Sequence, residues 1–326
     1  MQASQTDGPK HEKYRALIAQ AQALPPVATA IVHPCDQVSI EGAVESAELK
    51  LIDPVFVGPT DKIADAARRA GLDISGYTVV DVPHSHAAAA RAVQLVREGR
   101  AEAVMKGSLH TDELMGAVVA HDGGIRTERR ISHCFVMDVP GHPVPLIVTD
   151  AAVNIAPSLE DKADIIRNAI DLARALKLPG IWVAILSAME TVNSKVPSTI
   201  EAAALCKMAD RGQIEGALLD GPFALDNAIN ADAAAIKHIV SPVAGRANVL
   251  VVPDLEAGNM LAKSLSFLAG ADAAGIVLGA RVPIILTSRA DSVLARRASC
   301  ALAGLVAHAR REAAAASIKP EGGAAR

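Results

Sequence analysis

Residues 144–176 read VPLIVTDAAVNIAPSLEDKADIIRNAIDLARAL, and they contain one complete strand–loop–helix unit. The apolar run Val144–Thr149 is typical of a buried strand. In Asp161–Leu176 the apolar residues recur at helical spacing. Ser158 and Asp161 follow Pro157 at the spacing of a capping box, which predicts where the helix begins.

The same alternation of strand and helix runs along the whole chain. The other strands that we predict are short apolar runs, at Val27–Val32, Pro54–Val57, Thr78–Asp81, Ala103–Met105, Cys134–Met137, Gly180–Leu186, Gly216–Leu219, Asn248–Val252, Ala274–Leu278 and Ile284–Thr287. Most are continuously apolar rather than alternating, which suits strands covered on both faces. The sequence therefore predicts an α/β fold with mostly parallel sheets.

One segment departs from this alternation. The runs ISHCFVMDV and PVPLIVTD are joined by Pro140-Gly141-His142-Pro143, which favours a turn between antiparallel strands. We expect the chain to pass between two lobes here. The predicted first lobe comprises residues 1–146 plus 282–326, and the second comprises residues 147–281.

Composition narrows the function classes. The net charge is −4 and aromatic residues make up 2% of the 326 residues, so neither a nucleic-acid backbone nor single-stranded bases are expected partners. Cys35, Cys134, Cys206 and Cys300 form no C-x-x-C pair, which indicates reduced thiols. We see no signal peptide and no apolar run long enough to span a membrane, so we expect a cytoplasmic protein.

Several well-known motifs are missing. The sequence contains no G-x-G-x-x-G after a strand, no G-x-S-x-G and no H-E-x-x-H. Residues 257–264, AGNMLAKS, end like a phosphate-binding P-loop, but Ala257 and Ala262 replace both of its glycines. Nucleotide-binding, serine-hydrolase and zinc-enzyme functions are disfavoured.

Polar residues follow five of the predicted strands at their carboxyl ends, where open α/β sheets bind ligands. These junctions lie at Lys106–Ser108, Asp150–Asn154, Ser187–Glu190, Asp254–Asn259 and Ser288–Ser292. We expect all five at one kind of edge, forming one cleft. Three of them also have a purely structural alternative. Thr111 or Asp112, and Asp291 or Ser292, can act as helix caps, and the acidic Asp254 and Glu256 at a helix entry suit the helix dipole.

The order of these segments resembles the phosphate acetyl/butyryltransferases, and most closely the butyryltransferase-like branch, which includes the transferase half of fusions with enoyl-CoA hydratase. The resemblance extends from about Pro25 to Ala307. Its most specific segments are PDLEAGN at residues 253–259 and LTSRADS at residues 286–292.

The resemblance implies the reaction acyl-CoA + phosphate ⇌ acyl phosphate + CoA, with a short acyl chain. It implies a two-lobed fold like that of isocitrate and isopropylmalate dehydrogenases, with the cleft between the lobes. It also implies a homodimer or larger homo-oligomer, with acyl-CoA and phosphate as substrates and neither a metal nor a tightly bound cofactor.

The resemblance also suggests roles for individual residues. Ser288 would hydrogen-bond the developing oxyanion, and Arg289 would hold phosphate. The acetyltransferase branch has an essential aspartate several residues later, which this sequence lacks, so Asp291 is the substitute general base. Arg130 with Ser132 forms a second anion contact. The remaining residues assigned to substrate binding are Lys106, Gly107, Ser108, Asp150, Asn154, Glu256, Gly258 and Asn259.

Two other functions compete with this interpretation. One is a metal- and NAD-dependent decarboxylating dehydrogenase of the same fold, with a metal site drawn from Asp220, Asp226, Asp254 and Asp291. The other is a binding partner that has lost catalysis, which the departure from the acetyltransferase pattern suggests.

Overall fold

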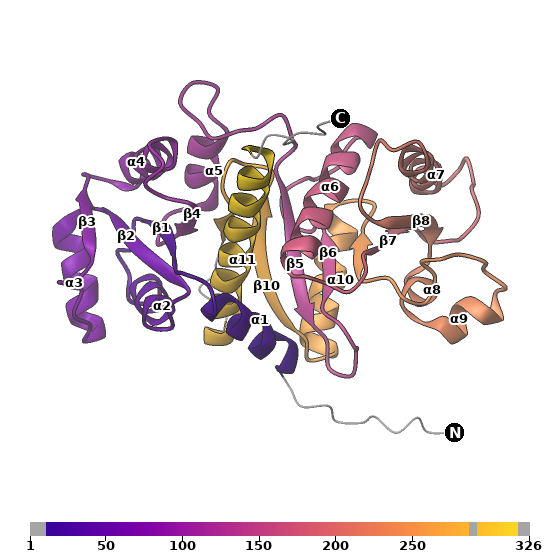
Figure 1. Ribbon diagram of the computed structural model, residues 1–326, viewed down its shortest axis with the longest axis horizontal. Coiled ribbons are helices and arrows are strands. Elements are labelled where there is room, and N and C mark those ends of the chain that lie inside the picture. Colours follow the sequence, from indigo (N-terminus) through magenta and orange to yellow (C-terminus); the bar gives the residue numbers. More distant parts are fainter. Residues whose placement is uncertain (1–10, 287–291, 319–326) are drawn as a thin grey trace, which may run out of the picture.

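The structure is a computed structural model that describes residues 11–286 and 292–318. In this part of the chain one 11-stranded sheet carries helices on both faces (Figure 1). The strands are β1 (Val27–Val32), β2 (Ile52–Gly58), β3 (Thr78–Asp81), β4 (Ala103–Lys106), β5 (Ser132–Asp138), β6 (Leu146–Thr149), β7 (Trp182–Leu186), β8 (Leu218–Phe223), β9 (Val249–Val251), β10 (Asp272–Leu278) and β11 (Ile284–Ile285). The helices are α1 (Glu12–Gln22), α2 (Gln37–Glu48), α3 (Thr60–Ala70), α4 (Ser85–Arg97), α5 (Thr111–Val119), α6 (Leu159–Ala175), α7 (Pro197–Asp210), α8 (Leu225–Ile229), α9 (Ala231–Ile236), α10 (Leu255–Leu268) and α11 (Val293–Ile318).

Every predicted strand has a counterpart, and β1 and β3 have the predicted bounds. The capping box that starts α6 is confirmed, because the Ser158 side chain accepts the Asp161 N–H while Asp161 accepts the Ser158 N–H. The hairpin is also confirmed, since β5 and β6 pair antiparallel across the turn at Gly141. Short apolar runs and local capping patterns thus specify the elements.

The strands lie in the order β3-β2-β1-β4-β11-β10-β5-β6-β9-β7-β8. β1 to β4 and β11 are parallel to one another, and so are β6, β7, β8 and β9. The pairings β11–β10, β10–β5 and β5–β6 are antiparallel. The two parallel sets therefore run in opposite directions. The mostly parallel sheet is as predicted. It runs without a break through both predicted lobes, so it does not mark where one lobe ends, and the lobe boundaries remain a prediction.

The core is layered unequally on the two faces of the sheet. On one face α1, α2, α3, α6, α7 and α11 share a single apolar cluster. On the other face the buried residues divide into two clusters, one under α4 and α5 and one under α8 and α10. Ile131 and Val153 pack at the edge of the first of these two clusters, where the chain goes from one half of the sheet to the other.

His133 on β5 is a buried histidine in the centre of the sheet, with 3% of its surface exposed. Its ring meets the Phe135 ring edge-on at 4.3 Å, and a Cβ on Gly275 of β10 would lie 2.7 Å from its Nε2. Its Nδ1 has no hydrogen-bond partner among the described residues. Burial lowers the pKa of His133 to about 4, although nearby Asp150 opposes the shift. The ring is therefore neutral at pH 7.

A neutral buried histidine makes stability depend on pH. Between pH 6.5 and 4 the unfolded chain binds the proton and the folded protein does not, so stability falls as the pH falls. In urea titrations at pH 7 and pH 4.5, we expect the free energy of unfolding to fall by about 2–3 kcal/mol more in the wild type than in His133→Gln. His121→Gln, at an exposed position, is the control and should behave as wild type. Equal losses in all three proteins would contradict a neutral His133.

Candidate active site

The Asp150 carboxylate, at the end of β6, is 3% exposed and accepts hydrogen bonds from several N–H groups. Its Oδ1 accepts the backbone N–H groups of Ala152 and Val153 at 2.9 and 3.0 Å. Its Oδ2 accepts the backbone N–H groups of His133 and Asn154 and the Asn154 side-chain amide, the last at 2.6 Å. A buried carboxylate needs such donors to replace water. These bonds fix the loop at residues 150–154 against the start of β5.

Asn154 connects the Asp150 carboxylate to the side chain of Arg130. Its Nδ2 donates to Asp150 and to the Ile131 carbonyl, and its Oδ1 accepts the Arg130 Nε–H at 2.7 Å. The Arg130 backbone N–H donates to Asp164. The guanidinium is thus held at its Nε, while 53% of the side chain stays exposed. Three residues predicted to bind substrate, Arg130, Asp150 and Asn154, are thus joined by hydrogen bonds, and we call them the Asp150 set.

Arg130 lines a cavity of about 430 Å³, which we call the arginine cavity. The lining combines three arginines with apolar side chains, namely Arg126, Arg129, Arg130, Met115, Val119, Ile131, Val153 and Asn154. Arg129 Nη1 pairs with Asp171 Oδ2 of α6 at 2.5 Å, whereas the Arg126 guanidinium has no ion pair with any described residue. Several guanidinium groups beside one apolar wall suit a ligand with phosphate groups and an apolar portion.

The start of α10 packs directly on the 150–154 loop. Asp254 caps this helix by accepting the Ala257 N–H at 2.8 Å. Asn259 Nδ2 donates to the Ala151 carbonyl at 3.3 Å. A Cβ on Gly258 would lie 2.9 Å from the Asp150 carbonyl oxygen, so a glycine is needed for this close approach. The predicted residues Gly258 and Asn259 therefore join the Asp150 set, while Glu256 in the first turn is exposed.

Lys106, Gly107 and Ser108 form a separate group at the end of β4. The Ser108 hydroxyl donates to the His33 carbonyl at 2.7 Å and accepts the Cys35 N–H. A Cβ on Gly107 would lie 2.8 Å from the same His33 oxygen. These contacts tie β4 to the loop after β1.

The N-cap of α5, the helix after β4, is not one of the two residues that the sequence suggested. α5 begins at Thr111, and its N-cap is His110 rather than Thr111 or Asp112. The residue before the helix has extended backbone, and its N–H is accepted by Glu113 Oε1 at 3.5 Å.

Ser132 points away from the arginine cavity. It is fully buried on β5, and its hydroxyl accepts a hydrogen bond from Asn168 Nδ2 of α6 at 2.9 Å. Arg130 and Ser132 are thus close in sequence but face different surroundings.

The described polar junctions lie at carboxyl ends of strands, as expected, but these ends do not all lie at the same edge of the sheet. β6, β7 and β9 run opposite to β4 and β11, so their carboxyl ends lie at the opposite edge of the sheet. The reason is the antiparallel pair β10 and β5 in the centre. The described junction residues therefore form two groups, the Asp150 set at one edge and Lys106–Ser108 at the other.

The three residues predicted to be catalytic, Ser288, Arg289 and Asp291, lie outside the described residues. Their flanks are described: β11 ends at Ile285 and α11 begins at Val293. The Ser292 hydroxyl accepts the Ala295 N–H at 3.1 Å. Ser292, one of the two residues considered as caps, therefore makes the contact of an N-cap.

Sequence reasoning missed Arg126, Arg129 and the α6 residues Asn168 and Asp171 that support the cavity. Asn168 Nδ2 donates to the Arg130 carbonyl as well as to Ser132. A signal for the arginines exists, because RTERR at residues 126–130 places three of them within five positions.

The four cysteines are free, and none has an activated thiol. Burial raises the pKa of the Cys35 and Cys300 thiols to about 11 and that of Cys134 and Cys206 to about 12. Across residues 11–286 and 292–318 no group of three or more His, Cys, Asp or Glu side chains is arranged to hold a metal ion. In the same part of the chain, no helix has the length and apolar character needed to cross a membrane.

Comparison with known proteins gives consistent results. A family model described as phosphate acetyl/butaryl transferase matches residues 84–303. A phosphate acetyltransferase from Rhizobium meliloti is 63% identical over 94% of this chain and 97% of that protein. A phosphate butyryltransferase from Clostridium beijerinckii is 38% identical over 91% of this chain and 98% of that protein.

Solved structures give the fold. A branched-chain phosphotransacylase from Enterococcus faecalis V583 superposes with a TM-score of 0.76 at 27% identity, covering 86% of this chain and 99% of that chain. A 4-hydroxythreonine-4-phosphate dehydrogenase from Klebsiella pneumoniae, 14% identical, covers the same shares with a TM-score of 0.54. The second likeness concerns the fold alone. The expected dehydrogenase-like α/β fold is confirmed, and no finding favours dehydrogenase activity.

The contact of α10 with the 150–154 loop can be tested with two glycines. In Gly258→Ala the new Cβ would lie 2.7 Å from a Val252 methyl group and 2.9 Å from the Asp150 carbonyl oxygen. We expect this overpacking to lower the free energy of unfolding by about 1–3 kcal/mol in urea titrations. Gly116→Ala in α5 is the control, because its Cβ meets nothing within 4 Å and should stabilise the helix by up to about 1 kcal/mol. If both variants were equally stable, this contact would be absent.

Proposed function

The chain belongs to the phosphate acetyl/butyryltransferase family and is a phosphate acyltransferase, and we propose that it moves a short acyl group directly between CoA sulfur and phosphate oxygen. In this reaction a phosphate oxygen attacks the thioester carbonyl carbon, and a tetrahedral intermediate with an oxyanion forms. The carbon–sulfur bond then breaks, and the proton of hydrogen phosphate ends on the CoA sulfur.

The observation that carries this proposal is the arginine cavity with its fixed Arg130. Both substrates are polyanions, and guanidinium groups bind phosphate through paired N–H donors. The bonds from Asp150 through Asn154 hold Arg130 before any ligand arrives, which lowers the entropy lost on binding. We propose that Arg126 and Arg130 bind acyl-CoA phosphates while Met115, Val119 and Val153 contact its apolar portion.

Direct attack is also supported by the cysteines. An acyl-cysteine intermediate needs a thiolate, and the raised pKa values of about 11–12 keep the thiols of Cys35, Cys134, Cys206 and Cys300 protonated at neutral pH. Holding two substrates in the correct geometry can supply roughly 7–11 kcal/mol of the barrier without a covalent intermediate.

We propose that Ser288, Arg289 and Asp291 carry out the chemistry. Ser288 donates to the oxyanion, which is worth about 2.7–4 kcal/mol for one well-placed donor. Arg289 holds the attacking phosphate. Asp291 returns the proton to the CoA sulfur in the forward direction and takes it from the thiol, whose free pKa is near about 8.5, in reverse. Because Ser292 supplies a cap for α11, this role for Asp291 does not compete with capping.

The finer properties belong to the same proposal. We infer a cytoplasmic homodimer or larger homo-oligomer that binds CoA as a substrate and keeps no tightly bound cofactor. Relatives named for acetyl and for butyryl transfer both align along nearly the whole chain, so short chains of two to four carbons are the expected acyl groups. One methylene changes discrimination by about 1–3 kcal/mol, which leaves room for overlapping use of these chains.

The direct test is phosphate-dependent release of CoA thiol, followed with a thiol reagent. We expect release from acetyl-, propionyl- or butyryl-CoA only when phosphate is present, with acyl phosphate formed in equal amount. The same measurement ranks the three acyl chains. Absence of phosphate-dependent release from all three would overturn the proposed activity.

The arginine cavity can be tested with Arg126→Gln, which removes one charge and leaves the bonds among Asp150, Asn154 and Arg130 intact. We expect the KM for acyl-CoA to rise about fivefold, equivalent to about 1 kcal/mol for one exposed charge contact, with kcat within twofold of wild type. The control is Arg68→Gln on α3, whose side chain is 74% exposed and which should not change KM. An unchanged KM for acyl-CoA in Arg126→Gln would contradict the proposal that acyl-CoA binds in the arginine cavity.

Phosphate binding can be tested with Arg289→Ala. Loss of a charged hydrogen-bond donor costs about 1.5–3 kcal/mol, so we expect the KM for phosphate to rise between about tenfold and a hundredfold. The KM for acyl-CoA should change much less. Steady-state rates over a matrix of both substrate concentrations separate the two effects, and an unchanged phosphate dependence would contradict the role of Arg289.

A further inference from the structure

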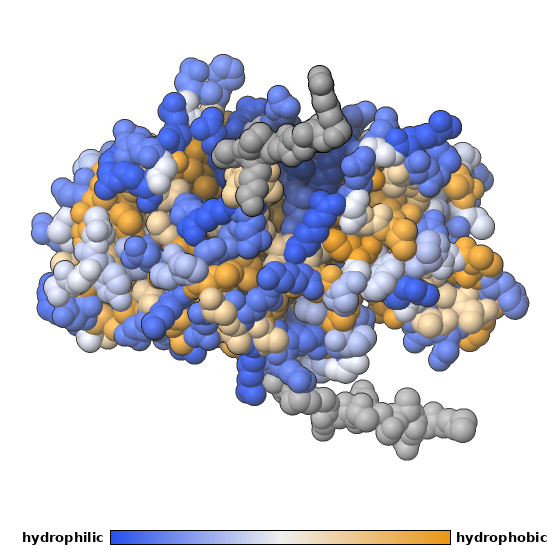
Figure 2. All heavy atoms as spheres, in the orientation of Figure 1, coloured by the Kyte–Doolittle hydropathy of each residue, from blue (hydrophilic) through white to orange (hydrophobic). Residues whose placement is uncertain are grey.

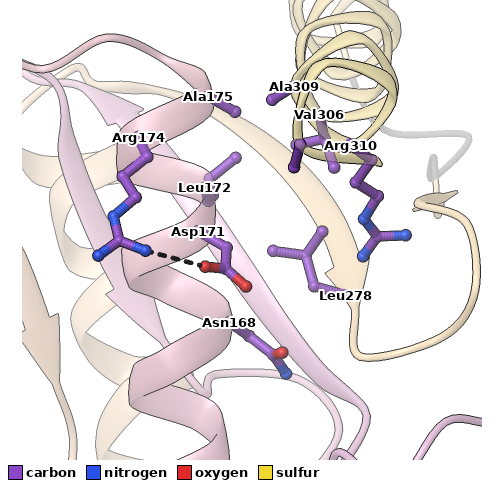
Figure 3. Close-up of a pocket in the computed structure, with 10 residues that line it drawn as sticks. Asn168, Asp171, Leu172, Arg174, Ala175, Leu278, Val306, Ala309 and Arg310 are labelled. Atoms are coloured by element: carbon purple, nitrogen blue, oxygen red, sulfur yellow. Dashed lines mark ion pairs between the residues drawn. The ribbon is translucent and has the colours of Figure 1, made fainter. Parts of the chain in front are cut away.

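A second cavity of about 260 Å³ lies between α6 and α11, over β10 (Figure 3), and we call it the α6–α11 groove. Figure 1 shows where these three elements lie in the fold. Figure 2 shows this face of the molecule, with a recessed and mainly hydrophilic region between the two helices. Its lining residues are Asn168, Asp171, Leu172, Arg174, Ala175, Leu278, Val306, Ala309, Arg310 and Ala313. The volume is just below the roughly 300–1,000 Å³ of pockets for drug-sized ligands, so the groove suits a smaller molecule.

Arg310 gives the groove an uncompensated positive charge. Its Nη1 donates to the carbonyl oxygens of Ala280 and Arg281 at 3.1 and 2.8 Å. No carboxylate forms an ion pair with it among the described residues, because Asp171 pairs instead with Arg129 and, at 3.7 Å, with Arg174. Burial lowers the pKa of the Arg310 guanidinium, and neighbouring Arg129 acts in the same direction while Asp171 opposes it. Arg310 is half-buried, and its described hydrogen-bond acceptors are neutral carbonyl groups, so a bound anion would stabilise its charge.

The rest of the groove is apolar. Leu172 of α6 and Val306 of α11 face each other across it, with Leu278 of β10 between them (Figure 3). Ala309 and Ala313 are small enough to leave the space open. A ligand that fills this volume therefore needs a hydrocarbon portion beside its charge.

We propose that the α6–α11 groove binds a short-chain monocarboxylate, with the carboxylate on Arg310 and the hydrocarbon chain against Leu172, Leu278 and Val306. A single small anionic group matches one guanidinium, and a chain of about three to four carbons matches the short apolar floor. The site is distinct from the arginine cavity, because none of the lining residues is shared.

The two cavities are nevertheless in contact through their walls. Asp171 lines the groove, and its carboxylate accepts the hydrogen bond from Arg129, which lines the arginine cavity. Asn168 also lines the groove and donates to the Arg130 carbonyl. Arg129 lines the arginine cavity, so its positive charge attracts a polyanion bound there. A carboxylate bound beside Asp171 adds negative charge on the groove side and offsets this attraction. It should therefore weaken polyanion binding in the arginine cavity, and acyl-CoA should weaken carboxylate binding equally. This regulatory step rests on the proposed function, whereas the binding site does not.

Binding can be measured with butyrate and the full chain by ligand-observed NMR or calorimetry. We expect saturable binding with a Kd on the order of 1 mM, which is within the range for so small a ligand. Arg310→Gln and Ala309→Leu, which fills the groove, should each weaken binding at least tenfold. The matched control is Ala315→Leu at an exposed position of α11, which should bind butyrate as wild type does.

Three results would overturn the site. They are no saturable binding to the wild type, wild-type binding by both groove variants, or displacement of butyrate by inorganic phosphate at equal concentration, because phosphate has no chain for the apolar floor. Thermal melting shows whether Arg310→Gln or Ala309→Leu fails to fold. If one of them does, the binding result is read from the other.

The regulatory step is tested by acyl-CoA kinetics at saturating butyrate. We expect the KM for acyl-CoA to rise at least fivefold in the wild type and in Ala315→Leu, and to stay constant in Ala309→Leu. Asp171→Asn should retain butyrate binding but lose most of this effect. Butyrate binding without any change in KM would overturn the coupling. Absence of phosphate-dependent thiol release without butyrate would instead count against the proposed function, and the binding result would stand on its own.

Discussion

The buried Asp150 carboxylate is the constraint on which the site depends. An ionised carboxylate removed from water must be matched by hydrogen-bond donors. Here the donors come from the start of β5 and from the loop after β6, so satisfying the charge fixes where these segments meet. The same charge holds Asn154, which in turn holds Arg130. The close packing of α10 against this loop follows from the same arrangement.

The central antiparallel strands β5 and β10 place the candidate site residues at two edges of the sheet rather than one. The arginine cavity belongs to the edge at the end of β6, and Lys106–Ser108 belong to the edge at the end of β4. The paired side chains of Arg129 and Asp171 lie between the arginine cavity and the α6–α11 groove, since Arg129 lines the first and Asp171 lines the second. Because the two side chains pair, a change of charge in one cavity alters the electrostatic potential in the other. This is the physical basis on which we propose a link between acyl-CoA binding and a second ligand.

Sequence patterns predicted the elements well, because β-branched runs and a cap such as Ser158 act over a few residues. The family resemblance, together with the polar strand ends, suggested Arg130, Asp150, Asn154, Gly258 and Asn259 as site residues. The structure brings these five together, and their role in binding stays a prediction. Sequence patterns failed where the answer depends on pairing between distant segments. The direction of β10 is set by its neighbours, and it decides which strand ends meet. Ser132 faces α6 because of the strand's alternation within the assembled sheet. Asp171 supports Arg129 from 42 residues away, a contact that no local pattern indicates.

The central claim is that acyl transfer occurs directly, with both substrates held at once and no acylated protein. The most direct measurement is the pattern of initial rates over a matrix of acyl-CoA and phosphate concentrations, combined with incubation of the protein with radiolabelled acyl-CoA without phosphate. The account predicts intersecting double-reciprocal lines and no label retained on the denatured chain. Parallel lines together with stoichiometric labelling would show a covalent intermediate and would contradict it.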